Sequence, residues 1–219
     1  MKKICLILSA IVLASCSSEN EDITVPLDLT DKLKSVITTE ETRVYHYNDY
    51  GFVTDIITNK EGNPNTKYTY EGNKIVSTTV TNGIVSESEY FTYSDDLIIQ
   101  SEFFDGEYKH INDYFYDSSG VLIKTIRYIK EGSNPRIERF TEEYIYENEN
   151  VVTTTFNESG DVLVFKYEYD NKKNPYYAPF PSDFNKIYKV SNNNLTKITF
   201  YSGIHIVLYE YNEFDYPVN

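Results

Sequence analysis

The residue types that most often do chemistry are sparse in this sequence and widely separated. Three histidines, His46, His110 and His205, have no second histidine or cysteine at the spacing that a metal site needs. There is no G-x-S-x-G nucleophile motif, no glycine-rich phosphate loop and no H-E-x-x-H zinc motif. We therefore expect no metal, no cofactor and no enzyme activity.

Carboxylates are the one abundant reactive type. The chain of 219 residues has 34 Asp and Glu against 20 Lys and Arg, which gives a formal net charge of −14. A pair of carboxylates can hydrolyse glycosides, but no spacing singles out two of them, so a hydrolase is the least favoured function. Nucleic-acid binding is not expected, because phosphate contacts need clustered Lys and Arg.

Cys16 lies in a context that predicts a covalent modification. A positively charged start is followed by an apolar run, residues 4–14, which is too short to span a membrane and fits a secretory signal peptide. The sequence LASC, which ends at Cys16, resembles a bacterial lipobox. This likeness implies a lipoprotein signal peptide over 1–15 and a diacylglycerol on the Cys16 thiol. The alternative is an ordinary signal peptide followed by an incidental cysteine.

Residues 16–30 are polar and acidic, and they predict a flexible tether. The stretch 17–22, SSENED, resembles the export signal of Bacteroidetes lipoproteins that reach the cell surface. This likeness implies an outer-membrane lipoprotein, held in the lipid by acylated Cys16 and exposed on the cell surface. The alternative is a lipoprotein that faces the periplasm.

An aromatic-x-Tyr pair recurs along the rest of the chain. Its first members at 45, 68, 91 and 114 are 23 residues apart, and the same interval separates those at 144 and 167. Self-similarity at a fixed interval predicts a repeat architecture. The longer interval from 114 to 144 predicts an extended hairpin loop at 130–138. The pairs are Tyr45/Tyr47, Tyr68/Tyr70, Phe91/Tyr93, Tyr114/Tyr116, Tyr144/Tyr146, Tyr167/Tyr169 and Tyr209/Tyr211, with a degenerate copy at Tyr188/Val190.

Each repeat unit predicts a β-hairpin. Residues i and i+2 of a strand share a face, so each pair places two aromatic rings on one side. Turns of the form Asn/Asp-x-x-Gly at 48–51, 117–120 and 157–160 separate strands, and no segment is long enough for a helical crossover. We therefore predict a single all-β domain over 31–219. It is an antiparallel meander of about 15 strands from eight hairpin repeats of about 23 residues, arranged as a curled sheet, an open barrel or a sandwich.

The pattern Y-x-Y-[NDE]-x-x-G-x-[VIL] resembles the YD repeats of RHS-type proteins. It is more similar still to small YD-repeat-like lipoproteins of Bacteroidetes, on the lipobox and the segments 169–175 and 209–217. The resemblance covers 33–219. RHS shells enclose toxin domains, which needs a far longer chain, so that function is not implied here.

The segment 172–185, KKNPYYAPFPSDFN, breaks the repeat. Its three prolines preclude ladder hydrogen bonds. The preferred interpretation is that its aromatic residues cover one end or edge of the sheet. The alternative is a ligand-facing loop, in which Tyr176, Tyr177 and Phe180 form the contact patch.

Three functions remain open on the sequence alone. The first is a non-catalytic recognition or structural module that presents a Tyr-rich sheet to a protein or glycan. The second is a carrier of a lipid or other hydrophobic ligand in a β-barrel-like cavity, which a closed apolar cavity would favour. The third is a hydrolase, which two carboxylates facing each other across a cleft would favour.

The lipobox yields the first testable prediction. Replacing Cys16 by Ala removes the acceptor thiol, so the variant should leave the detergent phase in Triton phase partitioning, whereas the wild type should stay in it. Equal partitioning of the two proteins would contradict the anchor.

Overall fold

The fold is known from a computed structural model that describes residues 32–38, 40–83, 85–213 and 217. The expected signal peptide, Cys16 and the tether over 16–30 lie outside the described residues. The described part is an antiparallel β-meander with one short helix, which confirms the predicted fold class. Within it, no helix has the length and hydropathy needed to cross a bilayer.

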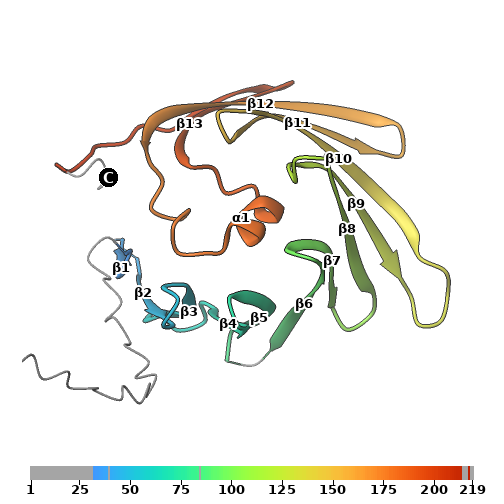
Figure 1. The fold of residues 1–219 in the computed structure, drawn as a ribbon, viewed down its shortest axis with the longest axis horizontal. Helices are drawn as coiled ribbons and strands as arrows, with labels where there is room; N and C mark the ends of the chain where they lie inside the picture. Colours follow the sequence, from blue (N-terminus) through green and yellow to red (C-terminus); the bar gives the residue numbers. More distant parts are fainter. Residues whose placement is uncertain (1–31, 39, 84, 214–216, 218–219) are drawn as a thin grey trace, which may run out of the picture.

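Fourteen strands form one sheet, and each pairs with its neighbours in sequence from β1 to β14. No described strand pairing joins β14 back to β1, so the sheet stays open. Figure 1 shows the sheet curling round the helix α1, Ser182–Tyr188. The strands are β1 (Ser35–Ile37), β2 (Thr42–Tyr47), β3 (Val53–Thr58), β4 (Asn65–Glu71), β5 (Lys74–Thr81), β6 (Ser86–Ser94), β7 (Leu97–Phe104), β8 (Lys109–Tyr116), β9 (Leu122–Lys130), β10 (Ile137–Glu147), β11 (Asn150–Glu158), β12 (Asp161–Lys173), β13 (Asn193–Phe200) and β14 (Gly203–Ile206).

A β-bulge recurs at the same place in six strand pairs. Between β4 and β5, Tyr70 pairs with Ile75 and Thr69 pairs with Ser77, so Val76 is an extra residue in β5. A bulge bends its strand and increases the local twist, so six of them in register curl the sheet in one direction. The extra residues are Thr54, Val76, Ile99, Ile123, Val152 and Thr196.

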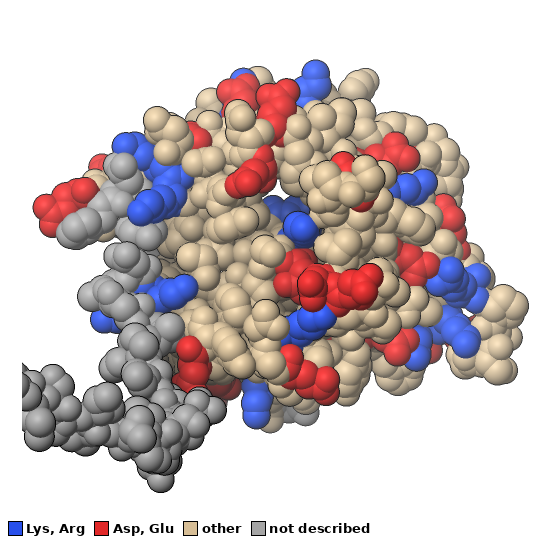
Figure 2. All heavy atoms as spheres, in the orientation of Figure 1, with Lys and Arg blue, Asp and Glu red and all other residues tan. Residues whose placement is uncertain are grey.

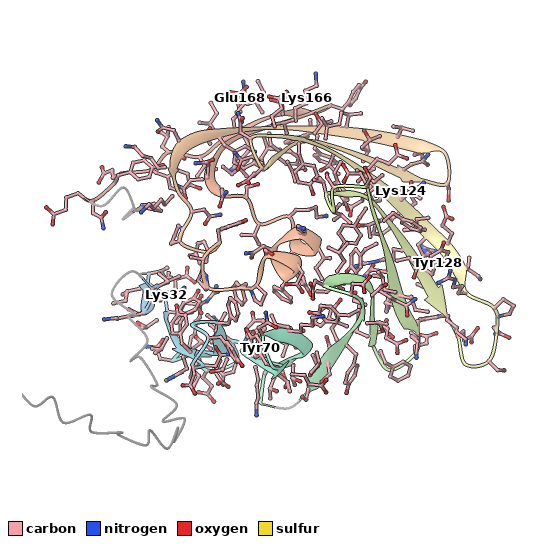
Figure 3. All side chains as sticks on the ribbon, in the orientation of Figure 1. Lys32, Tyr70, Lys124, Tyr128, Lys166 and Glu168 are labelled. Atoms are coloured by element: carbon pink, nitrogen blue, oxygen red, sulfur yellow. The ribbon has the colours of Figure 1, made fainter. Side chains whose placement is uncertain are left out.

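The core lies on the concave face, between the sheet and α1. Each bulge lets two residues that are three positions apart face inward. In β5 these are Ile75 and Thr78, and both are buried. The first aromatic of several pairs is buried on the same face, while Lys166 and Glu168 stand outside β12 (Figure 3). The hydrophobic cluster comprises Ile75, Phe91, Ile98, Tyr114, Leu122, Tyr144 and Val151 of the sheet with Phe184 and Ile187 of α1.

Two of the predicted repeat copies are wrong. Tyr188 ends α1 instead of opening a strand, and Tyr209/Tyr211 follows the last strand, where Tyr211 forms an isolated bridge with Pro217. The first difference follows from packing: the segment that prolines keep out of the ladder folds as about two helical turns and buries Phe184 against the sheet. The described sheet therefore has 14 strands instead of about 15.

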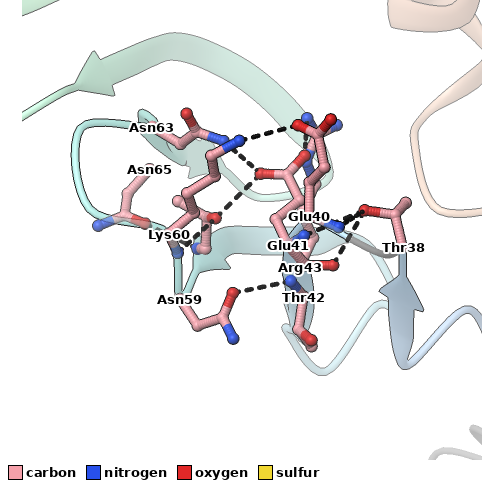
Figure 4. A network of polar contacts seen from close by, with 10 residues as sticks. Thr38, Glu40, Glu41, Thr42, Arg43, Asn59, Lys60, Asn63 and Asn65 are labelled. Carbon is pink, nitrogen blue, oxygen red and sulfur yellow. Dashed lines mark hydrogen bonds and ion pairs between the residues drawn. The ribbon is translucent and has the colours of Figure 1, made fainter.

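The N-terminal edge of the sheet is tied down by a polar network round Glu41 (Figure 4). The Glu41 carboxylate accepts hydrogen bonds from Asn63 Nδ2 at 2.6 Å and Thr58 Oγ1 at 3.1 Å, and it pairs with Arg43. The Asn63 hydrogen bond is the main cause of a lowered pKa at Glu41. Lys60 and Glu40 form an ion pair at 2.9 Å beside it. These contacts join the β1–β2 and β3–β4 loops.

The turn chemistry predicts a specific effect of glycine replacement. Asp117 Oδ1 accepts from the backbone N–H groups of Ser119 and Val121, and Gly120 sits at φ 77°. Ala is strained at this φ, so Gly120→Ala should lower the free energy of unfolding by about 1 kcal/mol. Gly203→Ala is the matched control, because Gly203 has no positive φ and a Cβ there meets nothing within 4 Å. Denaturant unfolding measures both, and equal effects would contradict the strained turn.

Candidate functional site

Three polar contacts hold α1 on the concave face. Lys186 Nζ donates to Gly120 O at 2.8 Å, in the turn between β8 and β9. Lys189 Nζ, one residue past the helix, forms an ion pair with Glu142 Oε2 at 3.0 Å. The Tyr188 hydroxyl donates to Glu89 in β6. A helix of seven residues is not stable alone, so these contacts and the burial of Phe184 and Ile187 position it.

A cavity of about 370 Å³ remains between α1 and the turn ends of β8 to β11. This volume lies within the range of small-molecule sites, roughly 300–1,000 Å³. Figure 2 shows a hollow beside α1, with basic side chains inside it and acidic ones near its rim. The lining residues are Val121, Leu122, Tyr146, Asn148, Glu149, Val151, Tyr177, Ser182, Asn185, Lys186, Lys189, Val190 and Ser191.

The second tyrosine of the aromatic pairs forms a repeated hydrogen bond. Its hydroxyl donates to the carbonyl of a residue near the start of the neighbouring strand, so that the phenol and a backbone oxygen satisfy each other. The bonds are Tyr70 to Val53 (2.7 Å), Tyr93 to Ile75 (3.0 Å), Tyr116 to Ile98 (2.7 Å) and Tyr169 to Val151 (2.9 Å), with Tyr47 to Leu33 at the N-terminal edge.

Tyr146 departs from this pattern. By its position in the repeat, its hydroxyl is expected to donate to Leu122 O. That bond is absent, and the buried hydroxyl has no hydrogen-bond partner. Burial, with a smaller contribution from Tyr169, raises the pKa of Tyr146 to about 12. The phenol therefore stays protonated at neutral pH.

Asn185 in α1 is another residue of the cavity wall with a buried, unpartnered atom. Its Nδ2 donates to Tyr177 O at 2.7 Å and to Phe180 O at 3.2 Å, which fixes the orientation of the amide. The opposite atom, Oδ1, is buried without a partner, and the residue is only 2% exposed. A buried acceptor without a donor costs about 1–3 kcal/mol, so Asn185 Oδ1 lowers the stability of this part of the fold.

Ser191 contributes a third polar atom. Its Oγ is buried and has no partner within hydrogen-bond distance. Ser191 nevertheless lies near enough to Tyr169 to offset part of the rise in the pKa of that phenol, which burial causes. Because the Tyr169 hydroxyl donates to Val151 O, its oxygen is the acceptor towards which the Ser191 hydroxyl can donate. The buried polar atoms of Tyr146, Asn185 and Ser191 are enclosed by protein groups.

A smaller cavity of about 210 Å³ lies on the other side of α1 and has two carboxylates in its wall, Glu89 and Glu142. Both carboxylates are engaged within the chain. Glu89 accepts from Tyr188, while Glu142 accepts from Tyr144 at 2.8 Å and pairs with Lys189. The nearby Glu142 charge adds to burial in raising the pKa of Tyr144. This arrangement fastens α1 to the sheet.

The residues of the expected contact patch have separate surroundings. Phe180 packs on Tyr68 and Phe184, with ring centroids 5.1 and 5.4 Å apart. Tyr176 is 44% exposed, and Tyr177 lines the 370 Å³ cavity beside α1. Their role in binding stays a prediction.

The three histidines are scattered over the sheet. His110 pairs with Asp105 at 2.7 Å, while His46 and His205 are exposed in β2 and β14. In the part of the chain that the structure describes, no group of three or more His, Cys, Asp or Glu side chains is placed to hold a metal ion.

No protein-family model matches the sequence, and no curated protein matches it. The fold is similar to the crystal structure of a porin-like protein from Bacteroides uniformis ATCC 8492, with a TM-score of 0.51. The two sequences are 13% identical, and the match covers 82% of this chain and 83% of that one. At this identity the likeness is one of fold.

The unpartnered Tyr146 hydroxyl can be tested against its repeat counterpart. Tyr116→Phe leaves Ile98 O without its donor and should cost about 1–3 kcal/mol of unfolding free energy. Tyr146→Phe removes an atom that has no partner, so the unfolding free energy should stay within about 0.5 kcal/mol or rise. Denaturant unfolding of both variants checks this, and equal losses would show that Tyr146 has a structural acceptor.

Proposed function

We propose that this protein is a membrane-anchored lipoprotein whose β domain is a non-catalytic recognition module. The anchor is the acylated Cys16, and the module binds a ligand at the cavity beside α1. The observation that carries the proposal is the cavity of about 370 Å³ beside α1, whose wall combines aromatic, aliphatic and polar side chains. A space of this size with such a lining is typical of small-molecule sites.

The carrier alternative has less support. A lipid carrier needs a large apolar space, and here the concave face is filled by α1, with Phe184 in ring contact with Tyr68 at 5.9 Å and Phe91 at 5.6 Å. The space that remains is lined in part by hydroxyl, amide and ammonium groups. Such a lining favours a polar ligand over an acyl chain.

The hydrolase alternative has less support still. Glu142 is held in an ion pair with the Lys189 ammonium at 3.0 Å, so its carboxylate is engaged within the chain. Both inward carboxylates already accept hydrogen bonds from α1 or the residue after it. Their positions support a structural role.

An outer-membrane, cell-surface location is part of the proposal. The lipobox and the acidic tether support it, and the structural neighbour is described as porin-like, which agrees with a place in the cell envelope. The alternative is a domain that faces the periplasm. The likeness to YD-repeat lipoproteins fits either location.

Recognition is tested with the full-length protein in two experiments. One is binding to a glycan array, and the other is a pull-down from envelope extracts. Tyr177→Ala removes a ring from the cavity wall and should abolish capture of any partner that the wild type retains. Tyr201→Ala is the matched control, because Tyr201 is 98% exposed in the β13–β14 turn, and capture should persist. No captured partner, or equal effects of the two variants, would contradict the proposal.

A further inference from the structure

Two basic residues line the cavity beside α1, and they differ in how their charge is balanced. Lys189 Nζ pairs with Glu142 Oε2 at 3.0 Å, so its charge is compensated within the chain. Lys186 Nζ donates to the Gly120 carbonyl at 2.8 Å, and within the described part of the chain it forms no ion pair. A carbonyl oxygen carries no net charge, so the Lys186 ammonium has no counter-charge there, and it keeps two further N–H donors.

Two acidic residues lie near this part of the fold without pairing with Lys186. Glu149 lines the cavity, but it is exposed and accepts from Asn192, so water screens its charge. Asp183, one turn earlier in α1, is not a residue of the cavity wall, and its Oδ2 is buried without a hydrogen-bond partner. The half-buried Lys186 therefore brings a positive charge without an ionic partner to the hollow, inside which Figure 2 shows basic side chains.

The wall beside this ammonium is largely apolar. Val121, Tyr177 and Val190 line the cavity, and each is half-buried, so each keeps accessible surface. Val121 directly follows Gly120, whose carbonyl holds the Lys186 ammonium, so the charge lies beside apolar groups. The volume of about 370 Å³ corresponds to about twelve water molecules at ~30 Å³ each. A compact molecule with one anionic end and an apolar body matches this combination.

We propose that the cavity beside α1 binds a small carboxylic acid as its carboxylate. The Lys186 ammonium donates to the carboxylate oxygens, and the apolar body of the ligand lies against Val121, Tyr177 and Val190. This assignment rests on the proposed recognition function and names its ligand class. A hydrogen bond between an ammonium and a carboxylate is roughly twice as strong as a neutral one, and it strengthens where water is excluded, so the charge decides which ligands enter.

The test is ligand-observed NMR at neutral pH with the full-length protein in a non-ionic detergent, and with the detergent alone as the blank. The probes are benzoate and its neutral isostere benzamide, with inorganic phosphate as an anion that has no apolar body. Benzoate should bind, and benzamide and phosphate should each bind at least about tenfold more weakly. This comparison uses the wild-type protein alone, so it does not depend on the folding of any variant.

Two variants locate the site. Lys186→Met keeps most of the apolar stem and removes the ammonium, so it should weaken benzoate binding about tenfold or more. Lys197→Met is the matched control, because Lys197 pairs with Glu168 at 2.6 Å in β13, outside the cavity wall, and its loss changes the net charge equally. Its Kd for benzoate should stay within about twofold. Circular dichroism checks that both variants are folded.

The other outcomes separate this inference from the recognition function. Benzamide that binds as tightly as benzoate would overturn the carboxylate assignment and leave a recognition module. Phosphate that binds as tightly would overturn the role of the apolar wall. Equal weakening by the two lysine variants would overturn the assignment to Lys186. Absence of binding by every probe would overturn the inference, whereas the recognition function would still be decided by the capture that Tyr177→Ala should abolish.

Discussion

The architecture depends on one repeated interaction, the hydrogen bond from a buried tyrosine hydroxyl to a backbone carbonyl beside a β-bulge. Each bulged strand turns two residues inward and bends the sheet. A phenol from the next strand then donates to a carbonyl beside the bulge, as Tyr93 of β6 does to Ile75 of β5. Because the bend has the same direction in every unit, 14 strands curl round a common interior instead of extending flat. A hydrophobic ring with a polar tip is suited to this position, which accounts for the abundance of Tyr.

The curl creates an interior that the repeat alone does not fill. The chain fills it with α1, whose Phe184 contacts rings from β4 and β6 and whose polar ends are fixed to Gly120, Glu89 and Glu142. This short helix joins strands that are far apart in the sequence. It also forms one wall of the cavity, so the same element stabilises the concave face and supplies Asn185 to the site.

Much of the fold could be predicted from the sequence, because the signals are local. Six aromatic-x-Tyr pairs lie in strands, and the Asn/Asp-x-x-Gly turns and the loop between β9 and β10 are where the spacing placed them. The copy at Tyr188 could not be recognised as helical, because Pro181 and the packing of Phe184 decide that segment, not its pattern. The six bulged residues are all Thr, Val or Ile, but these types are common throughout strands, so they could not be singled out as bulges.

The site was less predictable than the fold. Tyr177 lies in the segment that breaks the period, and it does line the cavity. Tyr146 looks like every other second tyrosine in the sequence; its one signal is that it follows the longer 30-residue interval. Asn185 gives no signal at all, since its importance comes from two backbone carbonyls that only the fold brings to its amide nitrogen.

The most direct measurement is an experimental structure of the protein at a resolution that shows ordered water. The account predicts five tyrosine hydroxyls bonded to backbone carbonyls, a Tyr146 hydroxyl without such a bond, and an open cavity beside α1. A Tyr146 hydroxyl bonded to Leu122 O, with α1 packed so that the cavity is closed, would contradict it.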